Sequence, residues 1–353
     1  MATWKKELLP RENGELVEMQ VPEIISASRS TDIPAFYADW FFHRLKVGYS
    51  TWTNPYNGVR NYVSYKNTRF IVFWSKDPSN LIPHLDYLEE QKIGCYIQFT
   101  LNDYEVEGLE KRVPPLQFRI DTFKRLVDRL GIGRVIWRFD PLMLTDEIGI
   151  EQLLSKIDNV GNRLYGYTEK LVFSFADIHT YKKVESNLRK NHIRYIEWAD
   201  AQMLSFAKSL SELNKKWNFT LATCGERVDL NQFRIVHNHC IDDELIIRLA
   251  FEDSVLMKFL DVKLHPKPVS DLFGNMEQIP KKAIILPNGT YATRSDNRDK
   301  GQRPFCGCMR SKDVGEYNTC AHLCEYCYAN SSKETALSNW MLHKGKPFGE
   351  SIK

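Results

Sequence analysis

Three cysteines close to the C-terminus, Cys320, Cys324 and Cys327, follow one another in a C-x3-C-x2-C pattern within the segment CAHLCEYCYAN. Three thiolates on one short loop can hold three corners of a cubane iron–sulfur cluster, whereas a fully ligated cluster takes four cysteines. The fourth iron is then open to another ligand, and an open metal position is typical of a catalytic site. The pattern therefore predicts an iron–sulfur centre with chemistry at its open iron.

A zinc site and a pair of disulfides are the alternative interpretations of these cysteines. Zinc sites usually combine two C-x2-C pairs, or one such pair with histidines. Here Cys324 and Cys327 form one pair, which Cys320 or His322 would have to complete. Disulfides need an oxidising compartment, and the N-terminal segment MATWKKELLPRENGELV has no apolar stretch that would direct secretion. We therefore expect metal ligands in a reducing, cytoplasmic setting.

Four further cysteines, Cys224, Cys240, Cys306 and Cys308, come from two separate regions of the chain. Four thiolates are the number needed for a second, fully ligated iron–sulfur cluster or for a zinc ion. We expect such a second site, with iron–sulfur favoured over zinc, to fix the C-terminal segment onto the rest of the chain. The alternative is that these residues are free reduced thiols, which pack as small apolar side chains. Cys95 lies inside an apolar run and is expected in the core.

The composition is that of an ordinary folded protein. The 353 residues suffice for one large α/β barrel or for two domains, and a hydrophobic fraction of 43% supports a normal core. The net charge of +3 gives no electrostatic argument for nucleic acid and does not exclude it. No apolar run reaches the length of about 18 residues that a membrane span needs, so none is expected.

Short apolar runs rich in β-branched and aromatic residues alternate with amphipathic stretches up to about residue 250. This alternation is the signature of repeated βα units. The chain order predicts a full or partial (β/α) barrel over residues 1–264, with a doubly wound open sheet as the alternative. The expected strands are 24–28, 49–53, 70–74, 95–100, 135–139, 171–175, 219–224 and 245–249. Helical patterns between them include 34–46, 80–91, 115–130 and 202–216.

The segment 265–353 has a different character, because it is rich in Pro, Gly and Asn and shows little helical periodicity. We expect one short hairpin around AIILPNGTYAT (283–293) and a helix that starts near Cys327. The segment is therefore predicted to be a loop-rich unit that carries the cysteine motif and packs over the mouth of the barrel.

Polar residues directly after the predicted strands are candidates for the site, because in either architecture the active face lies at the carboxyl ends of the strands. Each residue alone is more often a cap or turn residue than a catalyst, so their collective placement matters. The candidates are Ser28, Arg29, Asp32, Thr53, Asn54, Ser75, Lys76, Thr100, Asn102, Arg138, Asp140, Asp177, His179, Cys224, Glu226 and Arg227.

The cysteine loop, with the aromatic Tyr326 directly before its third cysteine, resembles the cluster loop of the radical S-adenosylmethionine (SAM) enzymes. Other segments resemble, in the same order, the spore photoproduct lyase-like and DNA-repair-photolyase-like branch of that superfamily. They are TNPYN (53–57), FWSKDP (73–78), QFTLNDY (98–104), VPP (113–115) with Arg119, and VIWRFDPLML (135–144). The sequence departs from that branch where Asn54 stands for Asp, where Ser75 stands for Thr, and where Arg112-Val113-Pro114 lacks a Glu before the proline.

Two longer segments, SASRSTDIPAFY (26–37) and CGCMRSKDVGEYNTCAHLCEYCYAN (306–330), give a closer resemblance. They are similar to an uncharacterised bacterial domain-of-unknown-function family whose C-terminal cysteine cluster is likened to the radical SAM one. In radical SAM enzymes the cysteine loop normally follows the first barrel strand, whereas here it comes last. The loop-rich stretch before Cys306 has some 40 residues, which at about 3.3 Å per extended residue can cross a barrel. We therefore expect the triplet to lie near Ser28, Arg29 and Lys76.

The resemblance implies that a 4Fe–4S cluster on the triplet binds SAM and cleaves it to a 5′-deoxyadenosyl radical, which abstracts hydrogen from a substrate. Lys76 would pair with the SAM carboxylate, and Arg138 with Asp140 would close the pocket or contact substrate. A solvated lysine and a structural ion pair at the rim are the respective alternatives. The remaining SAM contacts would come from Thr53, Ser75, Thr100 and Tyr326.

The resemblance also implies a flavodoxin- or ferredoxin-type reductant as partner, and it makes a nucleic-acid base one candidate substrate. Two other classes of function stay open at this point. The first is an iron–sulfur electron-transfer protein, which would not need a polar SAM pocket at the strand ends. The second is a zinc-stabilised binding module.

Overall fold

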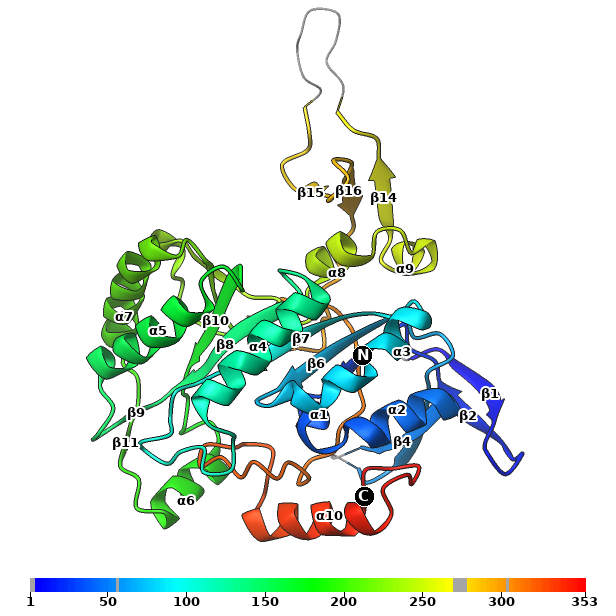
Figure 1. Cartoon of the computed structure of the whole chain (residues 1–353), viewed down its shortest axis with the longest axis horizontal. Helices are drawn as coiled ribbons and strands as arrows, with labels where there is room; N and C mark the ends of the chain where they lie inside the picture. Colours follow the sequence, from blue (N-terminus) through cyan, green and yellow to red (C-terminus); the bar gives the residue numbers. More distant parts are fainter. Residues whose placement is uncertain (1–3, 55–56, 269–277, 303–304) are drawn as a thin grey trace, which may run out of the picture.

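The computed structural model describes residues 4–54, 57–268, 278–302 and 305–353, so that Pro55 and Tyr56 of the TNPYN segment lie outside the described residues. The chain has a mixed α/β fold built around a parallel sheet of eight strands (Figure 1). In sheet order these strands are β13 (Ile235–His237), β12 (Thr220–Thr223), β10 (Lys170–Phe175), β8 (Val135–Leu142), β7 (Gly94–Thr100), β6 (Phe70–Ser75), β3 (Ile24–Ala27) and β17 (Lys312–Asp313).

The strands from β3 to β13 follow one another across the sheet in chain order, and each pairs in parallel with the next. A doubly wound sheet reverses its strand order part of the way along, so the alternative architecture is wrong for this chain. Strands β13 and β17 stand at the two edges, and no ladder joins them within the described ranges. The described strands therefore form an open sheet rather than a closed barrel.

One face of the sheet is covered by the helices that connect its strands. Helix α4 shows how the sequence produces this packing: Leu116, Ile120, Phe123 and Val127 recur at helical spacing and are buried, and the helix ends at Gly131, whose φ is 92°. The helices before and after the strands on this side are α1 (Ile33–Phe36), α2 (Ala38–Val47), η1 (Pro78–His84), α3 (Leu85–Glu90), α4 (Leu116–Leu130), α5 (Ile150–Leu164), α6 (Lys182–Lys190), α7 (Asp200–Leu213), η2 (Asn214–Lys216) and η3 (Asn231–Phe233).

The opposite face of the sheet forms a second apolar cluster, with Phe70, Val72, Tyr96 and Ile136 among its members. It packs against helices α8 (Asp243–Ala250) and α9 (Ser254–Phe259). The predicted strand at 245–249 is wrong, because this segment belongs to α8. The Asp242 side chain caps the helix by accepting the N–H of Leu245, and this cap, with two acidic residues in the first turn, outweighs the apolar run.

A separate sheet of four strands contains the run 49–53, which was predicted to belong to the large sheet. Its order is β1 (Lys6–Pro10), β2 (Leu16–Gln20), β5 (Arg60–Ser64), β4 (Tyr49–Thr53). The run 49–53 is a strand, as predicted, but it pairs antiparallel with β5, the next strand along the chain, and not with the large sheet. Thr53 therefore does not lie at the carboxyl edge of the parallel sheet.

The predicted hairpin around 283–293 is confirmed. Strands β15 (Ile284–Ile285) and β16 (Tyr291–Arg294) pair antiparallel, and β14 (Val262–His265) adds to the other side of β16. Strand β14 thus spans the predicted domain boundary between residues 264 and 265. A further small pair joins β9 (Leu144–Thr145) to β11 (Tyr195–Ile196).

The last helix, α10 (Lys333–Gly345), begins later than predicted, because Ser332 and not Cys327 is its N-cap and accepts the N–H of Thr335. The cysteine segment before it is irregular, and Asn318 and Leu323 within it have φ values of 63° and 55°. Figure 1 shows α10 at the end of the molecule opposite to the β14–β16 sheet. Among the helices of the described ranges, none is long and apolar enough to cross a membrane.

Candidate functional site

Asp313 holds the C-terminal segment at the carboxyl end of the large sheet. It lies in β17, which pairs in parallel with β3, opposite Ser26. Its carboxylate accepts hydrogen bonds from the hydroxyls of Ser26, Ser28 and Ser30 at 3.0, 2.7 and 3.1 Å, and from the backbone N–H of Arg29 at 2.8 Å. The tail therefore reaches the loop after the first strand of the parallel series, where the sequence predicted it.

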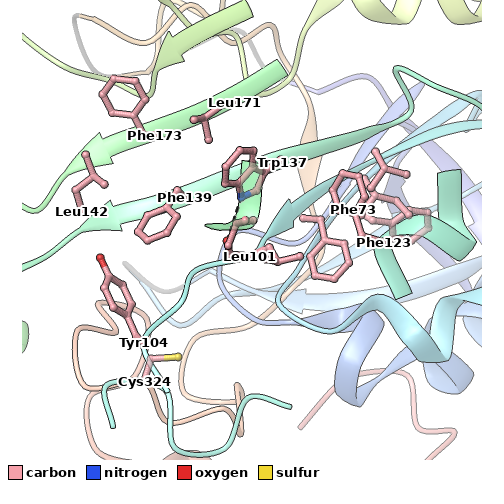
Figure 2. Packing of buried hydrophobic residues seen from close by; sticks show 14 of the residues in the cluster. Phe73, Leu101, Tyr104, Phe123, Trp137, Phe139, Leu142, Leu171, Phe173 and Cys324 are labelled. Carbon is pink, nitrogen blue, oxygen red and sulfur yellow. Dashed lines mark hydrogen bonds between the residues drawn. The ribbon is translucent and has the colours of Figure 1, made fainter. Parts of the chain in front are cut away.

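The cysteine loop contacts the ends of β3 and β6 and packs on the main apolar core. The Tyr328 hydroxyl donates to the backbone oxygen of Arg29 at 3.0 Å, and Lys76 Nζ donates to the Tyr326 hydroxyl at 2.9 Å. Cys324 is itself a buried member of the core cluster, and Figure 2 shows it at the edge of that cluster near Tyr104. The predicted neighbourhood of the triplet, near Arg29 and Lys76, is confirmed.

Backbone N–H groups point at two of the three sulfurs. The donors are the N–H groups of His322 and Asp32 for Cys320, and of Ala329 and Asn330 for Cys327. Hydrogen bonds of this kind stabilise negative charge on sulfur and surround thiolates that bind iron–sulfur clusters and other metals. Burial raises the pKa of all three thiols when no metal compensates their charge. The donor set and its hydrogen bonds therefore fit a metal-bound triplet.

The spacing of the cysteine sulfurs does not by itself distinguish a cluster from a single ion. A tetrahedral zinc with bonds of about 2.3 Å holds its ligand atoms about 3.8 Å apart. In the described part of the chain, one group of three or more metal-binding side chains has all its ligand atoms within 4.8 Å of one another, and that group is His239, Asp242 and Asp243. Neither the triplet sulfurs nor any three sulfurs of Cys224, Cys240, Cys306 and Cys308 all lie that close together, so this comparison applies equally to both cysteine groups.

The His239 group itself is accounted for by other contacts. Asp243 forms an ion pair with Arg294, whose Nε lies 3.0 Å from the carboxylate, and Asp242 caps α8.

Lys76 belongs to a buried polar network beside the triplet. Its Nζ donates to Glu110 Oε1 at 2.6 Å, and Asn102 Nδ2 donates to the same oxygen and to the Tyr326 hydroxyl, both at 3.0 Å. Burial would raise the pKa of Glu110, but Lys76 and Arg119 lower it to about 2. The solvated-lysine alternative is therefore wrong, and the carboxylate next to Lys76 is that of Glu110.

Glu110 is the principal site residue that the sequence did not indicate. The resemblance placed a glutamate directly before a proline, and Glu110 is instead four positions before Pro114, in an irregular loop. The stretch between Asn102 and Arg119 also contains Asp103, Glu105 and Glu107, so acidic character alone does not single out Glu110.

Ser75 lies in a second network, centred on Asp32. The Ser75 hydroxyl donates to Asp32 Oδ1 at 2.7 Å, the N–H of Lys76 donates to Oδ2 at 2.7 Å, and His322 Nε2 lies 2.9 Å from Oδ2. Asp32 also caps α1 by accepting the N–H of Ala35. The network links β6, the loop after β3 and the cysteine loop, and it gives Ser75 a structural partner.

The two threonines predicted to bind SAM are not brought into these networks. Thr53 is in the small sheet, where its backbone N–H donates to Glu316 Oε1 at 3.2 Å. Thr100 ends β7 opposite Arg138 and is half-buried, and its side chain makes no hydrogen bond with the described residues.

Arg138 and Asp140 form an ion pair with each other at the end of β8. The Ser174 hydroxyl donates to Asp140, and Arg138 Nη1 donates to Gln98 Oε1 and to Cys240 Sγ, both at 3.2 Å. This geometry agrees with the alternative that the two residues form a structural ion pair at the rim. A catalytic role for the pair stays a prediction.

The structure brings Cys224, Cys240, Cys306 and Cys308 together, as the sequence predicted. The sulfurs of Cys224 and Cys240 are 3.2 Å apart, and Cys308 is in hydrogen-bond contact with both Cys240 and Cys306. They belong to the apolar cluster on the face opposite that of Cys324, so the chain has two distinct cysteine groups.

Comparison with known proteins gives one family match. A protein-family profile described as "Domain of unknown function (DUF1848)" matches residues 24–329, a range that includes both cysteine groups. No curated protein matches the chain. A crystal structure of a proposed alpha-L-fucosidase from Bacteroides thetaiotaomicron VPI-5482 is similar at 10% sequence identity and a TM-score of 0.24, over 73% of this chain and 96% of that one. Similarity at that level says nothing about fold or activity. The chain belongs to the DUF1848 family.

Proposed function

We propose that this member of the DUF1848 family is a radical SAM enzyme that holds a 4Fe–4S cluster on Cys320, Cys324 and Cys327. The observation that carries the proposal is the position of the C-x3-C-x2-C loop, which lies at the carboxyl end of a parallel sheet with backbone N–H groups directed at two of its sulfurs. A cluster with an open iron would supply the electron that cleaves SAM to a 5′-deoxyadenosyl radical.

The architecture supports this site. Parallel strands that follow one another in chain order are those of a (β/α) barrel, and we propose that the open sheet is a partial barrel. Active sites of such sheets lie at the carboxyl ends of the strands, which is the edge that the tail crosses.

The polar networks around the triplet would orient the loop. Lys76, held by Glu110, fixes the hydroxyl of Tyr326 directly before Cys327. Asp32 holds the other end of the loop through His322, which is two residues after Cys320. Packing of Cys324 on the core excludes water from one side of the site. The chain's own contribution is therefore to hold three thiolates in fixed positions at the carboxyl end of the sheet, where water is partly excluded.

Few of the side chains predicted to bind SAM have a hydrogen-bond donor that is not already used within the protein. An ammonium group has three N–H donors, and Lys76 uses two of them on Glu110 and Tyr326, so one remains for a carboxylate. Among the residues predicted to bind SAM, the Thr100 hydroxyl is the other group with a hydrogen-bond donor that no described residue uses. We retain these two for SAM and place Thr53, Ser75 and Tyr326 in supporting roles. The substrate, for which a nucleic-acid base is one candidate, and a flavodoxin- or ferredoxin-type reductant belong to the same proposal.

The test is cluster assembly and SAM binding without oxygen. The chain is reconstituted with iron and sulfide, reduced, and its electron paramagnetic resonance spectrum is recorded before and after SAM is added. We expect a cluster signal that SAM changes, and no such signal from the variant with all three cysteines replaced by Ala. A cluster signal that SAM leaves unchanged would favour the electron-transfer alternative. A colourless protein with zinc in place of iron at the triplet would favour the binding module.

A further inference from the structure

The second cysteine group is a chain of contacting sulfurs inside the protein. Cys240 and Cys308 are 2% and 3% exposed, and Cys224 and Cys306 are half-buried at the two ends. The sulfurs of Cys224 and Cys240 are 3.2 Å apart, and the thiol of Cys308 interacts with those of Cys240 and Cys306. Four thiols rarely meet in a buried core without a common partner, since each is a weak donor and a weak acceptor.

Donors converge on this group from several elements. The backbone N–H groups of Cys240 and Ile241 point at Cys308 Sγ at 3.2 and 3.4 Å. The side-chain amide of Asn238 donates to Cys240 Sγ at 3.2 Å, as does Arg138 Nη1. Hydrogen bonds to sulfur from backbone and amide groups stabilise thiolates, not neutral thiols, and they surround metal-bound cysteines.

Two arginines, the buried Arg138 and the half-buried Arg29, supply positive charge to the same place. Arg29 interacts electrostatically with Cys308, Cys240 and Cys306, and its Nη2 atom is buried without a hydrogen-bond partner. Arg29 and Arg138 both lie over the ring of Trp74, at 5.5 and 5.2 Å from its centroid. A buried N–H donor of a cationic side chain is costly without an acceptor, which indicates that an anionic group binds beside it.

We propose that Cys224, Cys240, Cys306 and Cys308 are the ligands of a single zinc ion, in a closed site that is separate from the triplet. One Zn²⁺ would replace the protons of the four thiols, which pass to solvent, and leave a centre of net charge −2. The charges of Arg29 and Arg138 offset part of that charge, since Arg138 is also paired with Asp140. The triplet has no comparable charge pair and leaves a metal position open, whereas four thiolates leave none.

A single ion suits these sulfurs better than a cubane cluster. The cysteine ligands of a cubane sit on four separate irons and must lie farther apart than ligands of one shared ion. Cys224 and Cys240 are 3.2 Å apart and Cys308 interacts with Cys240 and Cys306, but no three of the four sulfurs all lie within 4.8 Å of one another, so the two ends, Cys224 and Cys306, have to move inward to close around a single ion. The sequence-based preference for iron–sulfur at this site is therefore revised on the basis of sulfur spacing.

The zinc would connect three parts of the chain. Cys224 follows β12, Cys240 precedes α8, and Cys306 with Cys308 lies on the tail that continues to β17. The ion would thus fasten the tail on one face of the sheet, while Asp313 fastens it at the edge. It would also fix Arg138 against Asp140 through the bond to Cys240.

The test is the metal content of the full chain, purified anaerobically without a metal-binding tag. The variants are Cys306→Ser and Cys308→Ser, with Cys95→Ser as the matched control, because Cys95 is a buried thiol outside both groups. We expect about one zinc per chain in the wild type and in the control, and loss of that zinc in both variants. In protein loaded with cobalt, we expect a thiolate-to-cobalt charge-transfer band that the two variants lack.

The variant with Cys320, Cys324 and Cys327 replaced by Ala separates this proposal from the proposed function. It should keep its zinc whether or not the triplet binds a cluster. The proposal is overturned if the wild type holds no metal that depends on Cys306 and Cys308, or if Cys224 and Cys240 are found as a disulfide in the freshly isolated chain. It is also overturned if the metal lost in the two variants is iron accompanied by acid-labile sulfide.

Discussion

At the scale of single residues, the site depends on charges that are buried with a partner. Glu110 and Lys76 are the clearest case, since their side chains are 2% and 16% exposed and their charged atoms are 2.6 Å apart. Burial of two charges costs free energy that the pair offsets only while both members are present. The pair also bonds Tyr326, so its stability and the position of the cysteine loop are coupled.

We predict that Glu110→Gln lowers the free energy of unfolding by about 3 kcal/mol, because it leaves the Lys76 ammonium buried without a countercharge. Chemical unfolding of the variant and the wild type measures this difference. The double variant Glu110→Gln with Lys76→Met should recover part of the loss, since neither charge is then left alone. A Glu110→Gln protein as stable as the wild type would show that the pair is solvated in solution.

Lys312 gives a pH-dependent prediction. Burial lowers its pKa from 10.5 to about 8 in the folded chain. The unfolded chain then binds more protons between pH 8 and pH 10.5, so this group makes the folded state more stable as the pH rises through that window. The shift corresponds to about 3 kcal/mol at most, and the contact of its Nζ with the Trp52 ring at 3.5 Å reduces the cost of the charge.

Lys312→Met should therefore raise the unfolding free energy at pH 7 and leave a smaller difference from the wild type at pH 10. Guanidinium unfolding at the two pH values measures both differences. The matched control is Lys215→Met, because the Lys215 side chain is 72% exposed, and we expect little effect from it at either pH. Equal effects of Lys312→Met at pH 7 and pH 10 would contradict a lowered pKa.

At the scale of elements, the short strand β17 is what attaches the tail. Two residues of backbone pairing with β3 provide little stability by themselves, so the Asp313 carboxylate has to contribute most of the attachment. It accepts hydrogen bonds from three serine hydroxyls and from the N–H of Arg29, of which Ser26 lies in β3 and the others in the loop that follows it. The SASRS segment of the sequence is therefore a docking site for the tail.

Asp313→Ala should loosen the segment 306–330 while the rest of the sheet stays folded. Removal of the carboxylate leaves buried hydroxyls unsatisfied, at a cost of about 1–3 kcal/mol for each buried polar group left without a partner. Hydrogen–deuterium exchange should show faster exchange in residues 306–330 and unchanged exchange in β8 and β10. Asp86→Ala, at a side chain that is 79% exposed, serves as the control. Unchanged exchange in the tail would show that other contacts hold it.

The sequence predicted most strands of the large sheet, but it misassigned two segments. Short apolar runs and amphipathic stretches indicated most strands of the large sheet, because burial on both faces requires continuous apolar residues. The run at 245–249 was predicted as a strand although it is part of α8. A buried helix turn and a buried strand have the same composition, and only the Asp242 cap distinguishes them here. The strand at 49–53 was identified but assigned to the wrong sheet, because pairing partners are not encoded locally.

Among the site residues, the two cysteine groups were predictable from spacing and number. Asp32 and Asn102 were among the strand-end candidates, although their partners were not known. Glu110 and Asp313 were missed because each acts across a large separation in sequence. Asp313 bonds residues that precede it by more than 280 positions, and Glu110 bonds Tyr326, which is 216 positions away. Neither lies in a periodic pattern that could have marked it.

At the scale of the whole molecule, the chain places its cysteine-bearing segment last and folds it back to the first strand of the parallel series. The two cysteine groups lie in the apolar clusters on opposite faces of the same sheet, and the tail that carries five of these seven cysteines joins them. In this account one group is open and reactive, while the other is closed and holds the tail in place. The proposed catalytic site therefore depends on the C-terminal segment being docked.

Formation of 5′-deoxyadenosine from SAM distinguishes radical SAM chemistry from the other proposed functions. The reconstituted chain is incubated with SAM and a strong reductant without oxygen, and the product is measured by chromatography and mass spectrometry. We predict that the wild type and the Cys95→Ser control form 5′-deoxyadenosine, and that the variant with Cys320, Cys324 and Cys327 replaced by Ala forms none. If that variant forms as much product as the wild type, or if a wild type with a full cluster forms none, the assignment to radical SAM chemistry is contradicted.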